Sequence, residues 1–254
     1  MNPLFLAHGS PMLAIEQNEY SRFLQQTGAS IKPDAIVIFT AHWETDTVTI
    51  SSKDDEYETI YDFYGFPDEL YQVKYPAKGS TEVAALVGRL LEDGGFPVQF
   101  DRYRGLDHGS WTMLKHMFPK ADVPVVQVSV NPFRSPEEQY RIGEALRSLS
   151  GRNILVIGSG VTVHNLRAVK WGQREPEQWA VEFDDWLIEK MNAHDTKSLF
   201  DYERLAPHAK MAVPRAEHFV PLYIALGSGD PSKMPQIIHR SYQFGTLSNL
   251  SLRF

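Results

Sequence analysis

The sequence contains no cysteine in its 254 residues. The absence of cysteine excludes disulfide bonds, thiolate nucleophiles and cysteine-based zinc sites. Any bound metal ion must therefore be held by histidine, aspartate or glutamate side chains. Two well-known motifs are also missing. There is no Walker loop, which binds nucleotide phosphates, and no G-x-S-x-G turn, which carries a nucleophilic serine.

Basic residues and long apolar runs are scarce as well. The chain carries 25 Lys and Arg residues against 32 Asp and Glu residues, which gives a net charge of -7. No run of Lys or Arg is long enough to predict a nucleic-acid or membrane surface. The N-terminal apolar run, residues 4–7, is too short for a signal-peptide core or a membrane span. We therefore expect a cytoplasmic protein without nucleic-acid or membrane partners.

Short apolar runs alternate with segments of helical periodicity. We expect strands at 3–7, 35–41, 48–52, 97–100, 123–130 and 153–160, and helices at 80–95, 135–150, 175–194 and 218–227. Ser10 caps a helix directly or leads to a later start at Asn18, and Ser135 with Glu138 forms a capping box. This alternation predicts an α/β fold with a mostly parallel sheet covered on both faces, in a single domain spanning 1–254.

Two predicted connections are unusually long, at 53–79 and 195–217. Unstructured connections of this length in a compact domain usually cover a functional site. The C-terminal segment, 241–254, is expected to supply one or two closing strands. The GSG sequence at 158–160 lacks the third glycine and the later acidic residue of a dinucleotide-binding fingerprint.

Three of the nine histidines follow predicted strands. His8, His42 and His164 lie at or just past the carboxyl ends of three separate apolar runs. The carboxyl ends of parallel strands converge on one crevice, and neutral imidazole is the commonest metal ligand. Single loop histidines are usually only hydrogen-bonded, so a shared metal site and three unrelated positions both remain open.

The neighbours of His42 suit a site. Thr40 and Glu44 are candidates to hydrogen-bond the outer nitrogen of a ligating His42 ring, and Trp43 is a candidate to wall a pocket, although for Glu44 or Trp43 taken alone the ordinary structural interpretation is favoured. A solvated Glu44 and a packed Trp43 are the alternatives.

Two further histidines stand in polar turns. His108, between Asp107 and Gly109, is either a proton donor or substrate contact, or an incidental turn residue. Glu217 and His218 precede an apolar helix, so either side chain can face the crevice. The other four are expected to be structural: His116, His194, His208 and His239.

Six motifs taken together resemble the class III extradiol ring-cleavage dioxygenases of the LigB-like superfamily, in particular the single-chain DOPA 4,5-dioxygenase-like branch. The motifs are AHGSP (7–11), TAHWET (40–45), YDFYGFP (61–67), LDHGSW (106–111), GSGVTVHNL (158–166) and EHFVPL (217–222). The resemblance implies a three-layer αβα domain around a mixed, largely parallel sheet.

The resemblance also implies a metal site. His8 and His42 correspond to ligands, with His218 as the third, although the two-subunit branch uses a glutamate and Glu217 stands beside it. His164 corresponds to the general base, and relatives with bound zinc use it as a further ligand. His108 corresponds to a histidine that orients substrate or assists proton transfer.

The implied reaction is cleavage of a catechol ring, DOPA-like or simpler, by O2 to a semialdehyde. Fe(II) is required because triplet O2 reacts poorly with a singlet catechol, and Zn(II) can occupy the site but cannot transfer an electron. Ser10, Trp43 and Tyr64 are expected to contact substrate, and residues 61–64 to form part of a cover. We expect a monomer or a small homo-oligomer.

Two alternatives come from other functional classes. Proteins on the same scaffold bind peptides or signalling partners without oxygenase activity, although they need not keep all five histidines. A histidine cluster of this kind can also hold zinc and activate water in a hydrolase.

Overall fold

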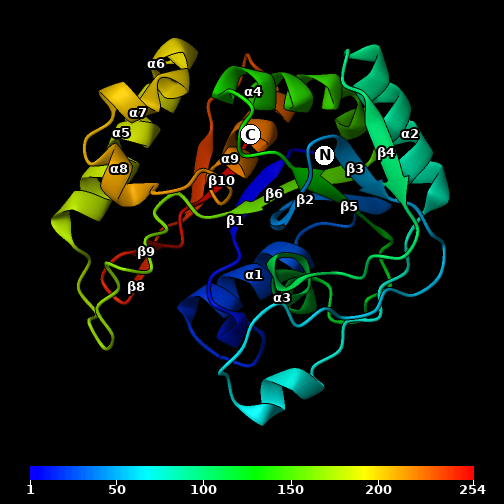
Figure 1. Ribbon diagram of the computed structural model, residues 1–254, viewed down its shortest axis with the longest axis horizontal. Coiled ribbons are helices and arrows are strands. Elements are labelled where there is room, and N and C mark those ends of the chain that lie inside the picture. The colour runs from blue at the N-terminus through cyan, green and yellow to red at the C-terminus, as the bar shows by residue number, and fades with distance from the viewer.

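The computed structural model describes residues 1–254, and a mixed, largely parallel sheet of eight strands forms its centre (Figure 1). The strand order is β4-β3-β5-β2-β6-β1-β10-β7. The bounds are β1 (Leu4–Ala7), β2 (Ala35–Glu44), β3 (Val48–Ser51), β4 (Val98–Asp101), β5 (Val125–Val130), β6 (Ile154–Gly160), β7 (Gln236–His239) and β10 (Ser251–Arg253). β5, β2, β6 and β1 run parallel to one another, while β3, β10 and β7 each form an antiparallel pair. The predicted fold class is confirmed.

Helices cover both faces of the sheet (Figure 1). On one face lie α1 (Glu19–Ala29) and α3 (His108–Met117), and on the other lie α2 (Thr81–Asp93), α4 (Pro136–Ala145) and α9 (Val220–Ser228). Alternate residues of β2 serve the two layers: Ile36 and Ile38 pack with α1 and α3, whereas Val37 and Phe39 pack with α2, α4 and α9. The strands are therefore apolar on both sides, which explains their continuous apolar sequence.

The capping signals act as the sequence indicates. Ser10 caps a short 3-10 helix, Pro11–Ala14, and Asn18 caps α1, so both predicted starts occur. Ser135 and Glu138 form the capping box of α4. The predicted helix at 135–150 is nevertheless divided, because α4 ends at Ala145 and a 3-10 helix follows at Arg147–Arg152.

The two long connections differ. The 53–79 segment holds only one 3-10 helix, Asp68–Gln72. The prediction that 195–217 is unstructured is wrong. This segment forms three short helices, α6 (Thr196–Phe200), α7 (Tyr202–Leu205) and α8 (Ala209–Ala212). They bury apolar side chains against α5 (Gln178–Asn192) and α9. At the C-terminus, β8 (Tyr242–Gln243) and β9 (Leu247–Ser248) form a separate hairpin before β10 closes against β1. None of the helices combines the length and hydrophobicity of a membrane span.

Candidate functional site

Two neighbouring strands place His8 and His42 at one edge of the sheet. His8 comes directly after β1, whose last residue, Ala7, pairs with Gly160 of β6. His42 lies inside β2 rather than after it, since the strand continues to Glu44 beyond an irregularity in its pairing with β5. The predicted strand end at residue 41 is therefore too early, but the histidine still reaches the expected edge.

His218 lies directly on β6 because of a glycine. A Cβ atom on Gly160 would stand 2.2 Å from the carbonyl oxygen of His218, a distance that no side chain tolerates. The backbone N–H of Val161 donates to that same carbonyl at 2.7 Å. Gly160 of the GSG sequence therefore lets the chain that leads into α9 bring His218 against the sheet.

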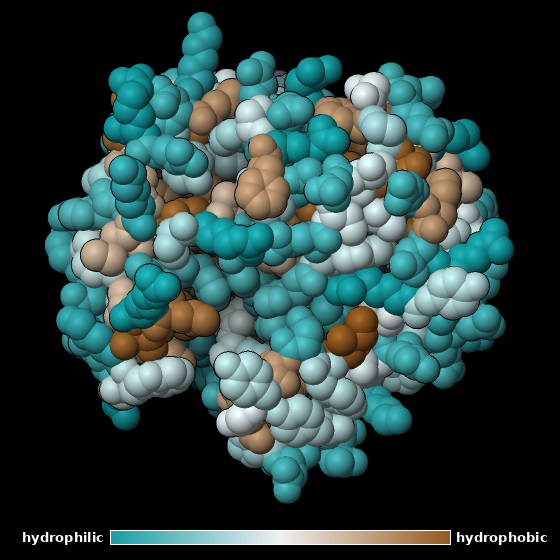
Figure 2. Space-filling view, in the orientation of Figure 1, coloured by the Kyte–Doolittle hydropathy of each residue, from teal (hydrophilic) through white to brown (hydrophobic).

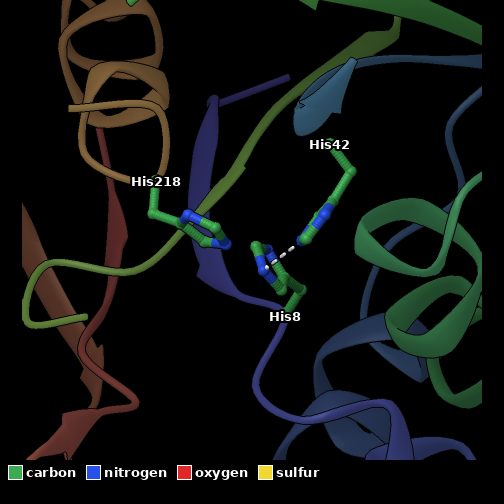
Figure 3. Close-up of side chains that lie close together, drawn as sticks. All are labelled: His8, His42 and His218. Carbon is green, nitrogen blue, oxygen red and sulfur yellow. Dashed lines mark hydrogen bonds between the residues drawn. The ribbon is translucent and has the colours of Figure 1, made fainter. Parts of the chain in front are cut away.

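The three imidazole rings converge from β1, β2 and the start of α9 (Figure 3). The Nε2 atoms of His8 and His42 are 3.1 Å apart, and the rings of His8 and His218 have centroids 5.1 Å apart. One nitrogen from each ring lies within 4.8 Å of the others. Two nitrogens bound to one ion at about 2.1 Å would be roughly 3.0–3.4 Å apart. The spacing of His8 and His42 therefore fits a shared metal ion.

Each outer ring nitrogen has a fixed partner. The Nδ1 atoms of His8, His42 and His218 lie 3.1 Å from Ser159 Oγ, 3.3 Å from Asp62 Oδ2 and 3.0 Å from Glu217 Oε1, respectively. Partners of this kind set the orientation and tautomer of a ligating imidazole and leave Nε2 free for the metal.

The partners predicted for His42 are wrong. Thr40 donates its hydroxyl to Asp107 Oδ1 at 2.7 Å, and Glu44 forms an ion pair with Arg215. Residues 40, 42 and 44 share one side of the strand, but the irregularity in β2 carries Glu44 away from the ring. Asp62, from the long 53–79 connection, contacts His42 instead.

Burial keeps these imidazoles neutral. It lowers the pKa of His8 and His218 well below the ordinary value, and neighbouring histidines add to the effect. Burial and the charge of His108 lower the pKa of His42 to about 3. Neutral imidazole is the form that binds metal, so the three rings are ready to bind an ion at pH 7 without losing protons.

The metal-free protein is expected to lose stability as the pH falls below about 6.5. The pKa values of His42 and His164 are about 3 and about 4 in the folded chain, against an ordinary 6.5, so the unfolded chain binds more protons between these limits. Each such group removes about 1.4 kcal/mol of unfolding free energy per pH unit. Urea unfolding at pH 7, 6 and 5 measures the effect, and equal midpoints at all three would contradict it.

Asp62 holds His108 as well as His42. The backbone N–H of His108, the first residue of α3, donates to Asp62 Oδ1 at 2.9 Å, and His108 Nδ1 lies 2.9 Å from Asp62 Oδ2. Burial alone would raise the pKa of Asp62, but the hydrogen bonds and charge of His108 hold it at about 2. The carboxylate therefore stays ionised and links the 53–79 segment to two histidines of the site.

His164 lies on the other side of the cluster. Its ring stacks on that of His218 with centroids 3.7 Å apart and an interplanar angle of 10°. Burial lowers the pKa of His164 to about 4, so the ring is neutral at pH 7. His164, Glu217 and His218 also have ligand atoms within 4.8 Å of one another, so the position suits either a free base or a further ligand.

A cavity of about 570 Å³ opens onto all five histidines of the predicted site. Its wall includes Ser10, as predicted, and Phe63 and Phe66 from the 53–79 segment. The rest of the apolar wall comes from Met12, Val161, Leu166, Trp171, Phe244 and Leu247. The space-filling view shows a hollow between the β8–β9 hairpin and the 3-10 helix at 68–72, with hydrophobic side chains on its β8–β9 side (Figure 2).

Trp43 and Tyr64 are not part of this wall. Trp43 points to the opposite side of β2 from His42, where it is buried and Arg104 lies 4.9 Å above its ring. Tyr64 is 92% exposed at the surface. Neither residue predicted to contact substrate therefore lines this cavity, whereas Phe63, between Asp62 and Tyr64, does.

Sequence reasoning missed Ser159 as the partner of His8. The feature that could have indicated this role is a polar residue inside the otherwise apolar run of β6. The Ser159 side chain is fully buried and contacts His8 Nδ1. The wall formed by residues 243–249 was also missed, because a short C-terminal hairpin gives no sign in the sequence of facing His8 and His42, which stand near the other end of the chain.

Comparison with known proteins was made at the level of sequence and of structure. A family model described as the catalytic LigB subunit of aromatic ring-opening dioxygenase matches residues 3–254. The chain is 40% identical to 4,5-DOPA dioxygenase extradiol of Beta vulgaris, over 98% of this chain and 95% of that protein. It is 36% identical to the protein of the same name from Escherichia coli K12, over 100% and 94% of the two chains. The crystal structure of an uncharacterized Escherichia coli K12 protein, 33% identical, matches 100% of this chain and 99% of its own with a TM-score of 0.85.

Proposed function

The chain belongs to the LigB family of extradiol, aromatic ring-opening dioxygenases, and from this premise we propose that it uses Fe(II) to open the ring of a catechol, DOPA-like or simpler, giving a semialdehyde. We propose that residues 1–254 form one catalytic domain. The observation that supports the proposal is the His8, His42 and His218 triplet at the floor of the cavity.

The three neutral imidazoles form the proposed ligand set, with His218 rather than Glu217 as the third. Glu217 Oε1 contacts the Nδ1 of His218, and Glu217 Oε2 lies 3.2 Å from Arg215, so its carboxylate already has two partners. Bound Fe(II) would supply the one-electron chemistry that lets O2 react with a catechol.

The chain's own groups prepare the substrate. Neutral His164 is proposed to accept the proton that a catechol hydroxyl loses on binding, as a general base beside the ligand His218. His108, fixed at two atoms by Asp62, is proposed to hold the second oxygen of the substrate. Phe63 and Phe66 are proposed to pack against the ring and exclude water.

Metal reconstitution under anaerobic conditions tests the function. We expect protein loaded with one equivalent of Fe(II) to consume O2 when 4-methylcatechol is added and to form a yellow ring-opened product. Protein loaded with Zn(II) is expected to bind the ion and show no oxygen uptake, because zinc does not change its oxidation state. Absence of oxygen uptake by the Fe(II) form across neutral, cationic and anionic catechols would reject the proposal.

A further inference from the structure

Hydrogen-bond acceptors gather in the cavity beside Gly9, next to the proposed ligand His8. The side-chain oxygens of Asn249 and Gln243 each lie 3.9 Å from the position that a Cβ atom on Gly9 would take. Glu16 belongs to the same cavity wall. None of these three side chains has a part in the chemistry proposed above.

Asn249 is held so that its oxygen faces this space. Its Nδ2 donates to Ser241 Oγ at 3.2 Å, and its backbone N–H donates to the Ser241 carbonyl at 2.8 Å. The residue is only 2% exposed, yet it lines the cavity. No group of the protein donates to Asn249 Oδ1, so this side chain of a buried residue offers an oriented acceptor to a ligand in the cavity.

The charge near these amides is negative. Glu16 accepts one hydrogen bond, from Asn18 Nδ2 at 3.0 Å, and forms no ion pair. The other carboxylate in the wall, Glu217, lies 3.2 Å from Arg215, which also pairs with Glu44. The wall contains no lysine or arginine. A cationic group beside Gly9 would therefore meet two amide oxygens in a wall that carries the uncompensated charge of Glu16, whereas an anionic group would find no lysine or arginine there.

We propose that the enzyme selects catechols whose side arm ends in an ammonium group, bound by Asn249 Oδ1, Gln243 Oε1 and the Glu16 carboxylate. An ammonium carries three N–H donors, which matches these three acceptors. Gly9 follows His8 directly, and both residues line the same cavity as Gln243 and Asn249, so a catechol held at the histidines can carry a short arm toward these oxygens. The inference rests on the proposed function, since it concerns the same cavity.

Three catechols with arms of similar length form the test: dopamine, 4-ethylcatechol and 3-(3,4-dihydroxyphenyl)propionate. We expect kcat/KM for dopamine to exceed that for 4-ethylcatechol by about tenfold, and the propionate to be lower than 4-ethylcatechol by a similar factor, because hydrogen bonds to a charged group contribute about 1.5–3 kcal/mol. Equal values for the three compounds, or a preference for the propionate, would overturn the inference.

Variants assign the preference to the named residues. Glu16→Gln is expected to lower the dopamine to 4-ethylcatechol ratio several-fold, and Gln243→Leu to lower it as well. Glu19→Gln, which removes an exposed carboxylate outside the cavity wall, is the matched control and should keep the ratio. An unchanged ratio in both cavity variants would contradict the assignment.

Binding of unreactive analogues separates this inference from the function itself. Calorimetry with 2-phenylethylamine and 3-phenylpropionate needs no turnover, and we expect the protein to bind the amine more tightly by about tenfold. If none of the three catechols is opened, the proposed function fails while the calorimetry still decides the charge preference. If 4-ethylcatechol is opened and the amine does not bind more tightly, only the preference fails.

Discussion

A His8→Ala variant is expected to retain less than about 1% of the ring-opening activity and to lose stoichiometric metal binding. His8 is 1% exposed, its Nε2 lies 3.1 Å from that of His42, and its Nδ1 contacts Ser159. Loss of a residue that only orients a ligand already costs 10–100-fold in affinity or activity, so loss of a ligand should cost more than about 100-fold. Metal content after anaerobic Fe(II) loading, and oxygen uptake, measure the two effects.

The control for this variant is another buried histidine outside the cavity. His116 lies under the 3-10 helix at 11–14, where its Nε2 contacts the Leu13 carbonyl at 2.6 Å. His116→Gln keeps a donor for that carbonyl and should leave metal content unchanged. One full equivalent of tightly bound iron in His8→Ala would show that the ligand set is different from the one proposed.

The second large effect is expected from His164→Gln, with kcat lowered by about 10²–10⁴-fold, the usual contribution of a general base. Metal binding should persist, because the proposed ligands His8, His42 and His218 remain. Glutamine has an amide in place of the ring, so it cannot take the catechol proton near neutral pH.

The pH profile identifies the role of His164. In the parent enzyme, kcat/KM should fall on the acid side as His164 becomes protonated, toward its pKa of about 4. The His164→Gln variant should lose that acid limb. If the variant instead loses its metal together with its activity, His164 acts as a ligand with Glu217 and His218, the alternative that their spacing allows.

The sheet and the edge that carries the histidines could be predicted from the sequence. Apolar runs such as AIVIFTA are long enough to be buried on both faces, and the first polar residues after them must lie near the sheet's edge. His8 and His42 are brought together at this edge as expected, whereas His218, which precedes α9, was assigned to the site by the family resemblance. The family resemblance, confirmed by the family match, supplied the chemistry that these positions alone left open.

The contacts around the ligands could not be predicted in the same way. Asp62 meets His108 across 46 residues of sequence, through a connection without regular periodicity, so no local pattern pairs them. Trp43 shows the opposite case, because adjacent residues of a strand point to opposite faces, and its separation from His42 could have been foreseen. The irregularity that removes Glu44 from His42 depends on the pairing with β5 and leaves no clear mark in the sequence.

The glycines of β6 limit how this centre could be copied into another protein. A Cβ at Gly158 would lie 2.2 Å from the Pro221 carbonyl, just as one at Gly160 would meet His218. The position of the His218 imidazole is thus set by direct contact between the glycine backbone of β6 and the segment that begins α9. Grafting three histidines onto a different parallel sheet would leave the third one too far out unless both glycines were transferred with it.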